Sequence, residues 1–286
     1  MSLPQPPTVT HCYRHPERET GRRCTRCGKP ACSDCLIQAQ VGSHCLDCAK
    51  AVQPDLKARV KYANASQPTL MTYAIMAINI AVFMYVGARD SGTLGGGIGS
   101  SRGVSQAQID LGLNLGLLQR DHHWYQLVTS GFLHFGILHI ALNMYLLYLL
   151  GQLLERSLGR TRFALLYMAS LLGGSLGVLI INQNAISGGA SGAVFGLMAA
   201  AAVAMHRQGI NILQTGIGRT LVLNLVLTFL ISGISIGGHL GGIVAGGLCS
   251  LVMMAPKWKP VPKWATFAAP VVVGLVAVVI SVGLAS

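Results

Sequence analysis

Two polar side chains in apolar surroundings, Ser191 and His239, are the residues of this chain best suited to carry out chemistry. Ser191 lies in the run GGASGAVFG at residues 188–196, between two long apolar segments. Its small neighbours leave room for a substrate carbonyl and leave backbone N–H groups free to hold an oxyanion. His239 lies in a second run, GGHLGGIVAGG, where burial of an ionisable group is costly and therefore indicates function. Together they predict a nucleophile and its general base.

Small residues accompany both side chains and offer a second explanation for them. Glycines recur every four residues on the two segments: Gly192 and Gly196 on the first, and Gly238, Gly242 and Gly246 on the second. This spacing allows two helix backbones to approach closely, which can bring imidazole to hydroxyl. The alternative is that the glycines only pack helices and Ser191 is one more small residue. The presence of His239 favours the catalytic interpretation.

Composition places the chain among multi-pass membrane proteins rather than soluble ones. It is 52% hydrophobic and only 10% charged, with a mean hydropathy of +0.54. Seven apolar stretches approach the ~20 residues that cross a bilayer: about 69–88, 131–151, 163–182, 191–206, 217–233, 235–255 and 265–284. The residues before 69 are polar and rich in cysteine and arginine, so we expect no secretory signal.

The positions of lysine and arginine predict the orientation in the membrane. With a cytoplasmic N-terminus, all but three of the 21 lysines and arginines fall on the cytoplasmic side; the exceptions are Arg89, Arg102 and Arg120. The same asymmetry explains the net charge of +12, so nucleic acid is not needed as a partner. We therefore expect a multi-pass protein of the plasma membrane whose C-terminus, after seven spans, lies outside.

A cysteine-rich segment precedes the apolar ones. It holds all the cysteines except Cys249, and they form, with one histidine, four pairs with a two-residue gap: Cys12 with His15, Cys24 with Cys27, Cys32 with Cys35, and Cys45 with Cys48. Eight such ligands suit two tetrahedral Zn²⁺ sites. The alternative is a disulfide framework, which a reducing cytoplasm disfavours. Since so short a segment cannot build a sufficient core, metal binding would supply most of its folding free energy, on the order of 10 kcal/mol or more.

The four pairs resemble a B-box type zinc finger, in which the first and third pairs share one metal and the second and fourth share the other. The resemblance implies two ligand sets: Cys12, His15, Cys32 and Cys35 in one, and Cys24, Cys27, Cys45 and Cys48 in the other. We expect a structural or partner-binding role, with His11 and His44 as solvated neighbours. The zinc-binding domain would occupy residues 1–48, and a linker bearing Pro54 and Pro68 would occupy 49–68.

The residue types in the membrane segments also narrow the possible chemistry. A zinc protease would need an HExxH motif, and the sequence has none. An aspartyl protease would need two buried aspartates, but Glu155 is the only acidic residue after Asp121. Serine chemistry is left, and because no carboxylate lies at the depth of Ser191 and His239, we expect a dyad rather than a triad.

A further polar element is the run HFGILHIALN at residues 134–143. His139 and Asn143 are four residues apart, so they share a helical face and can donate hydrogen bonds to an oxyanion. Alternatively, they are a structural pair that satisfy each other across helices. His134 is off that face, near the interface, and is expected to pack in the core or against headgroups. Phe195 is expected to back the imidazole of His239, although plain packing explains it equally well.

Residues 69–255 resemble the rhomboid intramembrane serine proteases. Four motifs carry the resemblance: GASG at Ser191, GH with following glycines at His239, HxxxN at His139 and Asn143, and LER at 154–156. It implies that Ser191 is the nucleophile, His239 the general base, and His139 and Asn143 the oxyanion donors.

The resemblance also implies an all-α polytopic membrane fold with a six-helix core and a seventh C-terminal transmembrane helix within residues 256–286. The stretch from Arg89 to about Gln126 would be the family's membrane-embedded first loop. Where the family often has tryptophan followed by arginine, this chain has Trp124, Tyr125 and Gln126.

The expected activity is cleavage of transmembrane segments of other proteins in or near the outer half of the membrane, without a cofactor for catalysis. The zinc module would recruit substrates or a cytoplasmic protein partner. The alternative is a catalytically inactive rhomboid-like protein that binds or escorts membrane clients, which the joint retention of the four polar site residues disfavours. A transporter is disfavoured because the spans contain no acidic ion site.

Overall fold

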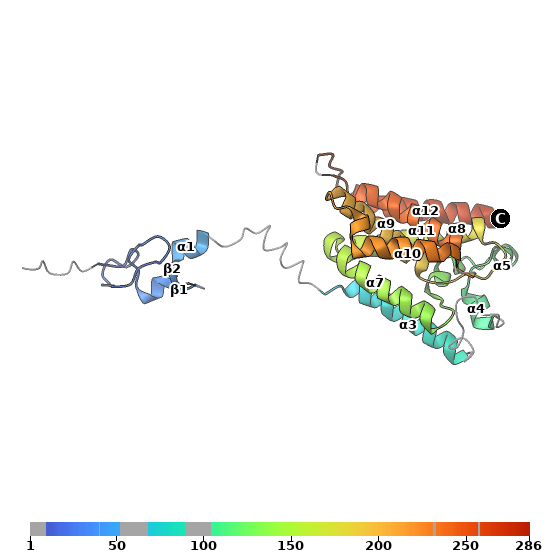
Figure 1. Ribbon diagram of the computed structural model, residues 1–286, viewed down its shortest axis with the longest axis horizontal. Coiled ribbons are helices and arrows are strands. Elements are labelled where there is room, and N and C mark those ends of the chain that lie inside the picture. Colours follow the sequence, from blue (N-terminus) through green and yellow to red (C-terminus); the bar gives the residue numbers. More distant parts are fainter. Residues whose placement is uncertain (1–9, 40, 52–67, 90–103, 231–232, 257) are drawn as a thin grey trace, which may run out of the picture. The chain divides into compact units, whose positions relative to one another are not determined.

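The computed structural model describes residues 10–39, 41–51, 68–89, 104–230, 233–256 and 258–286. It divides into two compact units, Met1–Ser66 and Gln67–Ser286. Most of the linker expected at 49–68, and the part of the expected first loop at 90–103, lie outside the described residues. Figure 1 shows the short N-terminal elements and the long helices of the second unit.

The N-terminal unit contains little regular structure. A short 3-10 helix (η1, Ser33–Cys35) leads into a two-stranded antiparallel sheet of β1 (Leu36–Gln38) and β2 (Ser43–Cys45), and α1 (Leu46–Ala51) follows. Apart from Ala31, its buried residues are cysteines: Cys12, Cys24, Cys32, Cys35 and Cys45. Thiols thus take the place of an apolar core in this unit. The stability of its fold must therefore come largely from interactions of the cysteine sulfur atoms.

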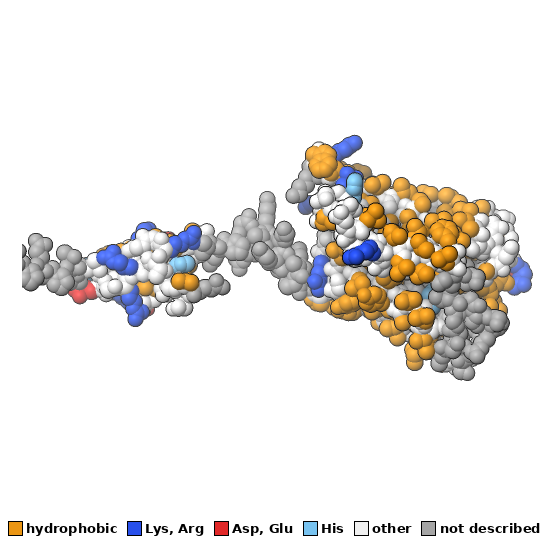
Figure 2. Space-filling model, in the orientation of Figure 1, with side chains coloured by type: hydrophobic (Ala, Val, Ile, Leu, Met, Phe, Trp, Pro, Cys, Tyr) orange, Lys and Arg blue, Asp and Glu red, His pale blue; other side chains and the backbone are white. Residues whose placement is uncertain are grey.

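The second unit is helical, and each of the seven predicted apolar segments contains a long helix. These are α3 (Leu70–Arg89), α7 (Ile137–Leu158), α8 (Arg160–Ile181), α9 (Ser191–Arg207), α10 (Gly216–Leu230), α11 (Ile236–Met253) and α12 (Ala265–Ala285). Hydrophobic side chains cover most of the visible face of this unit between its two ends (Figure 2), as expected for lipid contact. The chain is a multi-pass membrane protein.

Two of the seven helices are too short for a full membrane span, as their predicted segments, 191–206 and 217–233, already were. By length and composition, α3, α7, α8, α11 and α12 can cross a membrane. In contrast, α9 has 17 residues and α10 has 15. Both fall short of the ~20 residues of a full span.

The second predicted segment, 131–151, is wrong at its start because α7 begins only at Ile137. Gly136, with φ of 120°, breaks the helix there. The preceding residues form α6 (Gln126–Thr129) and η3 (Ser130–Phe132) instead. Leu127 and Leu133 are buried in this turn, so its apolar character reflects packing inside the protein and not a span.

Gln126 holds the described part of the first loop in place. Its Nε2 donates hydrogen bonds to the carbonyls of Ile109 and Asp110, at 3.1 and 3.2 Å, where α4 (Gln106–Leu111) ends. The hydroxyl of Thr129 donates to the carbonyl of Leu111 at 2.9 Å. A neutral amide, rather than a charged side chain, therefore anchors the described part of the first loop.

Glu155 joins α7 to the start of α3. Its carboxylate accepts hydrogen bonds from the backbone N–H groups of Met71 and Thr72, at 3.0 and 2.8 Å, and from the Thr72 hydroxyl at 2.7 Å. The side chain is buried, so these donors replace the water that a carboxylate requires. We call this end of the unit the Glu155 end and the opposite one the Ser191 end.

A seam of glycines brings α8, α9 and α11 into backbone contact. A Cβ on Gly174 would lie 3.1 Å from the Gly238 carbonyl oxygen and 3.2 Å from the Cα of Gly192. A Cβ on Gly246 would strike the backbone of Gly196. The predicted close approach of the two glycine-bearing helices is confirmed, and α8 joins them as a third partner.

The seam allows a matched pair of substitutions on α11. We expect Gly246→Ala to lower the free energy of unfolding by about 1–3 kcal/mol, the usual cost of overpacking. Gly247→Ala should leave stability unchanged or raise it slightly, because no atom lies within 4 Å of its Cβ position. Denaturation of the purified protein in detergent measures both. If the two variants change the free energy of unfolding equally, close backbone contact at Gly246 is not what excludes a side chain there.

Candidate active site and metal clusters

Ser191 is the first residue of α9 and is half-buried. The helix has no side-chain cap, since Ala190 is its N-cap residue. Among the described residues no acceptor is bonded to the N–H of Ser191, as is usual for the first turn of a helix. The Ser191 hydroxyl therefore lies next to a free backbone donor at the positive end of a helix, which favours a developing negative charge.

His139 and Ser191 border the same small space, which exists because residue 189 is glycine. A Cβ on Gly189 would lie 2.8 Å from His139 Nε2 and 3.7 Å from Ser191 Oγ, and its φ of 135° also disfavours a side chain. The Nδ1 atom of His139 accepts a hydrogen bond from the N–H of Phe135 at 3.4 Å. The proton of a neutral imidazole is then on Nε2, so His139 presents a donor beside the serine.

Asn143 lies one turn beyond His139 on α7, on the same face, and is buried. Its Nδ2 donates to the backbone carbonyl of His139 at 2.9 Å. An amide group has two N–H donors, so one remains for another acceptor. The local bond fixes the side chain and leaves it able to donate once more.

His134 packs in the core, one of the two environments expected for it. It is fully buried, so it does not face lipid headgroups. Its Nδ1 donates to the carbonyl of Phe132 at 3.2 Å, and its Nε2 accepts the N–H of Ala190 at 3.4 Å. Its ring lies edge-on to that of His139, with centroids 4.9 Å apart. His134 thus contacts both the residue before α9 and the ring of His139.

His239 lies near the start of α11, buried against α9. Its ring stacks on that of Phe195, with centroids 4.0 Å apart and an interplanar angle of 19°, which confirms the expected backing of the imidazole. Gly192 packs against the carbonyl of Gly238, so the residues next to Ser191 and His239 touch. No hydrogen bond joins these two side chains within the described residues; in the absence of substrate such contacts are often long.

Thr228 on α10 is a site residue that the sequence analysis missed. Its Oγ1 lies 2.7 Å from His239 Nδ1 and itself donates to the carbonyl of Asn224 at 2.8 Å. With its own proton committed, the hydroxyl accepts from Nδ1–H, and His239 Nε2 is left with a free lone pair. The only signal in the sequence is that Asn224 and Thr228 are polar residues four apart in an apolar segment.

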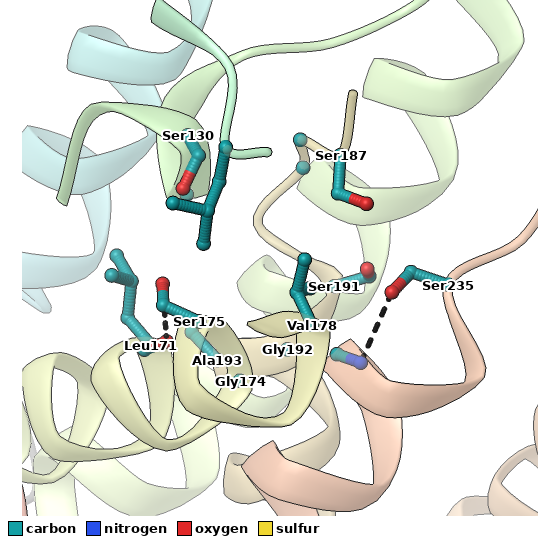
Figure 3. Close-up of a pocket in the computed structure, with 15 residues that line it drawn as sticks. Ser130, Leu171, Gly174, Ser175, Val178, Ser187, Ser191, Gly192, Ala193 and Ser235 are labelled. Carbon is teal, nitrogen blue, oxygen red and sulfur yellow. Dashed lines mark hydrogen bonds between the residues drawn. The ribbon is translucent and has the colours of Figure 1, made fainter. Parts of the chain in front are cut away.

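A cavity of about 40 Å³ opens next to Ser191. Small residues of α8, η3 and the loop before α9 line it, and Figure 3 shows Ser130, Ser175 and Ser187 around it with Ser191. The Ser175 hydroxyl is occupied, since it donates to the carbonyl of Leu127 at 2.7 Å. The space suits a small side chain or a few water molecules.

The N-terminal unit gathers its metal-ligating side chains into two clusters. One holds Cys12, His15, Cys32 and Cys35, and the other holds Cys24, Cys27, Cys45 and Cys48, with the ligand atoms of each within 4.8 Å of one another. These are the two sets that the B-box resemblance implies. His11 and His44 belong to neither.

The distances within the clusters fit four-coordinate metal. His15 Nδ1 lies 3.4 Å from the sulfurs of Cys32 and Cys35, and the sulfurs of Cys27 and Cys45 are 3.7 Å apart. Ligands on a tetrahedron with Zn–S bonds of ~2.3 Å would be about 3.8 Å apart. A disulfide would need a far shorter contact, and all eight cysteines are free.

Backbone groups also favour the thiolate of Cys24 in the second cluster. The N–H of Cys45 points at the sulfur of Cys24 at 3.1 Å. Burial acts to raise the pKa of the Cys24 thiol, but the backbone N–H groups of Cys45, Cys27 and Arg26 outweigh it and lower the pKa to about 6. Thiolates are the form in which cysteine binds metal.

Similar proteins point to one family. Residues 121–256 match the family model of the Rhomboid domain. The chain is 29% identical to rhomboid protease GluP of Bacillus subtilis (strain 168) over 194 residues, which are 67% of this chain and 36% of that protein. It is 42% identical to RHOMBOID-like protein 1 of Arabidopsis thaliana over 88 residues, 31% of this chain and 23% of that protein. The chain therefore spans only about a third of these two relatives or less.

A shorter relative is covered more fully. The putative rhomboid protease YdcA of Bacillus subtilis (strain 168) is 33% identical over 150 residues, which are 51% of this chain and 74% of YdcA. The family model and this relative agree with the helical membrane unit described above. The chain belongs to the rhomboid family.

Proposed function

We propose that this protein is an intramembrane serine endopeptidase with Ser191 as nucleophile and His239 as general base. The observation that carries the proposal is the bond between Thr228 and His239 Nδ1, which leaves Nε2 unprotonated on the side of the imidazole that a base must use. Gly192 and Gly238 pack together beside these residues, which supports the pairing of the Ser191 hydroxyl with the His239 imidazole when substrate is bound.

The proposed reaction follows from these positions. Ser191 Oγ attacks a peptide carbonyl while its proton passes to His239 Nε2, and the imidazolium then protonates the leaving amine. The N–H of Ser191, Nε2–H of His139 and the second amide hydrogen of Asn143 are the proposed donors to the oxyanion. A water molecule, deprotonated by the same imidazole, hydrolyses the acyl-enzyme.

The proposed substrates are transmembrane segments of other proteins. The small cavity beside Ser191 supports a small side chain at the scissile bond, and a substrate helix must unwind locally to present it. The distribution of lysine and arginine supports a cytoplasmic N-terminus, which would place Ser191 and cleavage in the outer half of the bilayer; the proposed bilayer is the plasma membrane.

The proposed metal of the N-terminal unit is Zn²⁺, one ion in each cluster. Sets of three or four thiolates in tetrahedral spacing favour zinc over harder cations. With four protein ligands per ion no position is open for chemistry, so the ions would be structural. The folded unit would then serve to recruit substrates or a cytoplasmic protein partner.

The dyad can be tested by substitution. Ser191→Ala and His239→Ala should each lower the cleavage rate of a transmembrane substrate by about 10³-fold or more, and the double variant should lose little beyond either, because the two act as one unit. A serine-directed covalent probe should label the parent and not Ser191→Ala. Ser250→Ala, at the other end of the unit, is the matched control and should stay active. Undiminished cleavage by Ser191→Ala, or an inactive and unlabelled parent, would favour the client-binding alternative.

The role of Thr228 has its own test. Thr228→Val keeps the shape but removes the acceptor of Nδ1–H, and we expect kcat/KM to fall by roughly 10- to 100-fold, which corresponds to about 1.4–2.7 kcal/mol. Thr228→Ser should restore the rate, because the hydroxyl returns. Thr220→Val removes a comparable bond on the same helix, from Thr220 to the Gly216 carbonyl, and should cost little activity. If Thr228→Val cleaves normally, the hydroxyl does not orient the base.

Metal removal tests the two-zinc proposal. The purified protein should contain two Zn²⁺ per chain, Cys24→Ser should retain about one, and Cys249→Ser, outside both clusters, should retain two. Chelation should unfold residues 11–48, because binding supplies roughly 10–16 kcal/mol per structural site. Cleavage of a substrate that needs no recruitment should persist. One zinc or none in the parent, or a folded N-terminal unit after chelation, contradicts the proposal.

A further inference from the structure

The Glu155 end of the helical unit carries a surface of cations and tryptophans that the proposed protease chemistry does not use. Blue side chains are visible at this end in Figure 2, and the connection from α11 to α12 lies there in Figure 1. We call this surface the α8–α12 edge and define it by Arg160 and Arg162 of α8 and by Trp258, Lys259, Lys263 and Trp264 before α12.

Direct contact brings the two halves of the α8–α12 edge together. The guanidinium carbon of Arg162 lies 5.7 Å from the ring centroid of Phe267, in the first turn of α12. Lys263 precedes Phe267 by about one helical turn. The Thr266 hydroxyl donates a hydrogen bond to the backbone carbonyl of Lys263 at 2.7 Å. Arg162 is half-buried, whereas Arg160, Lys259 and Lys263 are exposed.

Within the described residues, no carboxylate pairs with the cations of this edge. Glu155 is the only acidic residue after Asp121, and its two oxygens are occupied by Met71 and Thr72. None of the ion pairs found among the described residues involves a cation of the edge. A group of unneutralised cations at a membrane surface calls for an anion from outside the chain.

The aromatic residues of the edge indicate the medium in which that anion lies. Trp258 is 80% exposed and Trp264 is 71% exposed, which suits indole rings at the level of lipid headgroups. Below them, Phe267, Val271 and Leu275 recur every four residues and are all exposed, so they form one apolar stripe down α12. Cations, indoles and an apolar stripe thus follow each other from the headgroup level toward the membrane interior.

We propose that the α8–α12 edge binds an anionic phospholipid. Its phosphate would be held by the paired donors of Arg162 and by the ammonium of Lys263, and an acyl chain would lie along the apolar stripe of α12. A free phosphate could use the cations but would gain nothing from the stripe or from the exposed indoles. The chemistry therefore favours a lipid over a soluble anion.

The tryptophans of the edge are built-in probes for this site. The chain has only three tryptophans, so Trp124→Phe leaves Trp258 and Trp264 as the emitters. The full-length protein in bilayers is titrated with phosphatidylglycerol or phosphatidylcholine brominated on the acyl chain, at equal mole fractions. Stronger quenching by the anionic lipid measures its enrichment next to the edge.

We expect the anionic lipid to be preferred at least fivefold and the Arg162→Gln/Lys263→Gln variant to lose most of that preference, since each cation near an anionic headgroup contributes a factor of about five. Arg207→Gln/Arg219→Gln removes the same charge at the connection between α9 and α10 and should keep the preference. Unchanged quenching by phosphatidylcholine in both variants shows that α12 is still inserted.

Three results would overturn the proposal. Equal quenching by the two lipids in the parent would mean that the edge has no preference for anionic lipid. An equal loss in the two double variants would mean that the net positive charge, and not the edge, attracts the lipid. Loss of the preference for anionic lipid on addition of millimolar inorganic phosphate, at constant ionic strength, would mean that the cations bind a soluble anion.

Discussion

Backbone contact among α8, α9 and α11 is the constraint on which the rest of the membrane unit depends. Helices surrounded by lipid gain no hydrophobic stabilisation from association, so close van der Waals contact must hold them together. The glycines of the three helices permit that contact, and Gly192 packs on the carbonyl of Gly238 as a result. Ser191 directly precedes Gly192, and His239 directly follows Gly238. The packing that holds the unit together therefore also sets the position of the candidate dyad.

Neutral groups position most of the site, in keeping with the cost of burying charge. Thr228 orients His239, Gln126 holds the first loop, and His134 braces Ala190, all through uncharged hydrogen bonds. The one buried carboxylate, Glu155, is surrounded by three donors at the opposite end. These polar side chains are thus held by local hydrogen bonds, whereas the hydroxyl of Ser191, the proposed nucleophile, lies beside a free backbone donor.

The two units of the chain are stabilised in different ways. The membrane unit has a continuous apolar core, with Phe163, Leu166 and Tyr167 fully buried. The N-terminal unit buries mainly cysteine, and its two clusters place thiolates close enough that, without a metal, their mutual repulsion would oppose folding. Under the proposed two-zinc assignment, folding of the small unit would depend on metal supply, whereas the large one is built for a bilayer.

The sequence by itself determined the class of protein, the approximate positions of seven helices, the cysteine pairs and the residues proposed for catalysis. Those features rest on local hydropathy, on motif spacing and on the cost of placing a polar group in an apolar segment. Only the tertiary structure decided where α7 begins, that His134 is buried in the core, and that Thr228 faces His239. Each of these depends on contacts between residues far apart in the chain, and a pattern of hydropathy along one segment carries no information about the partner that a side chain meets on another.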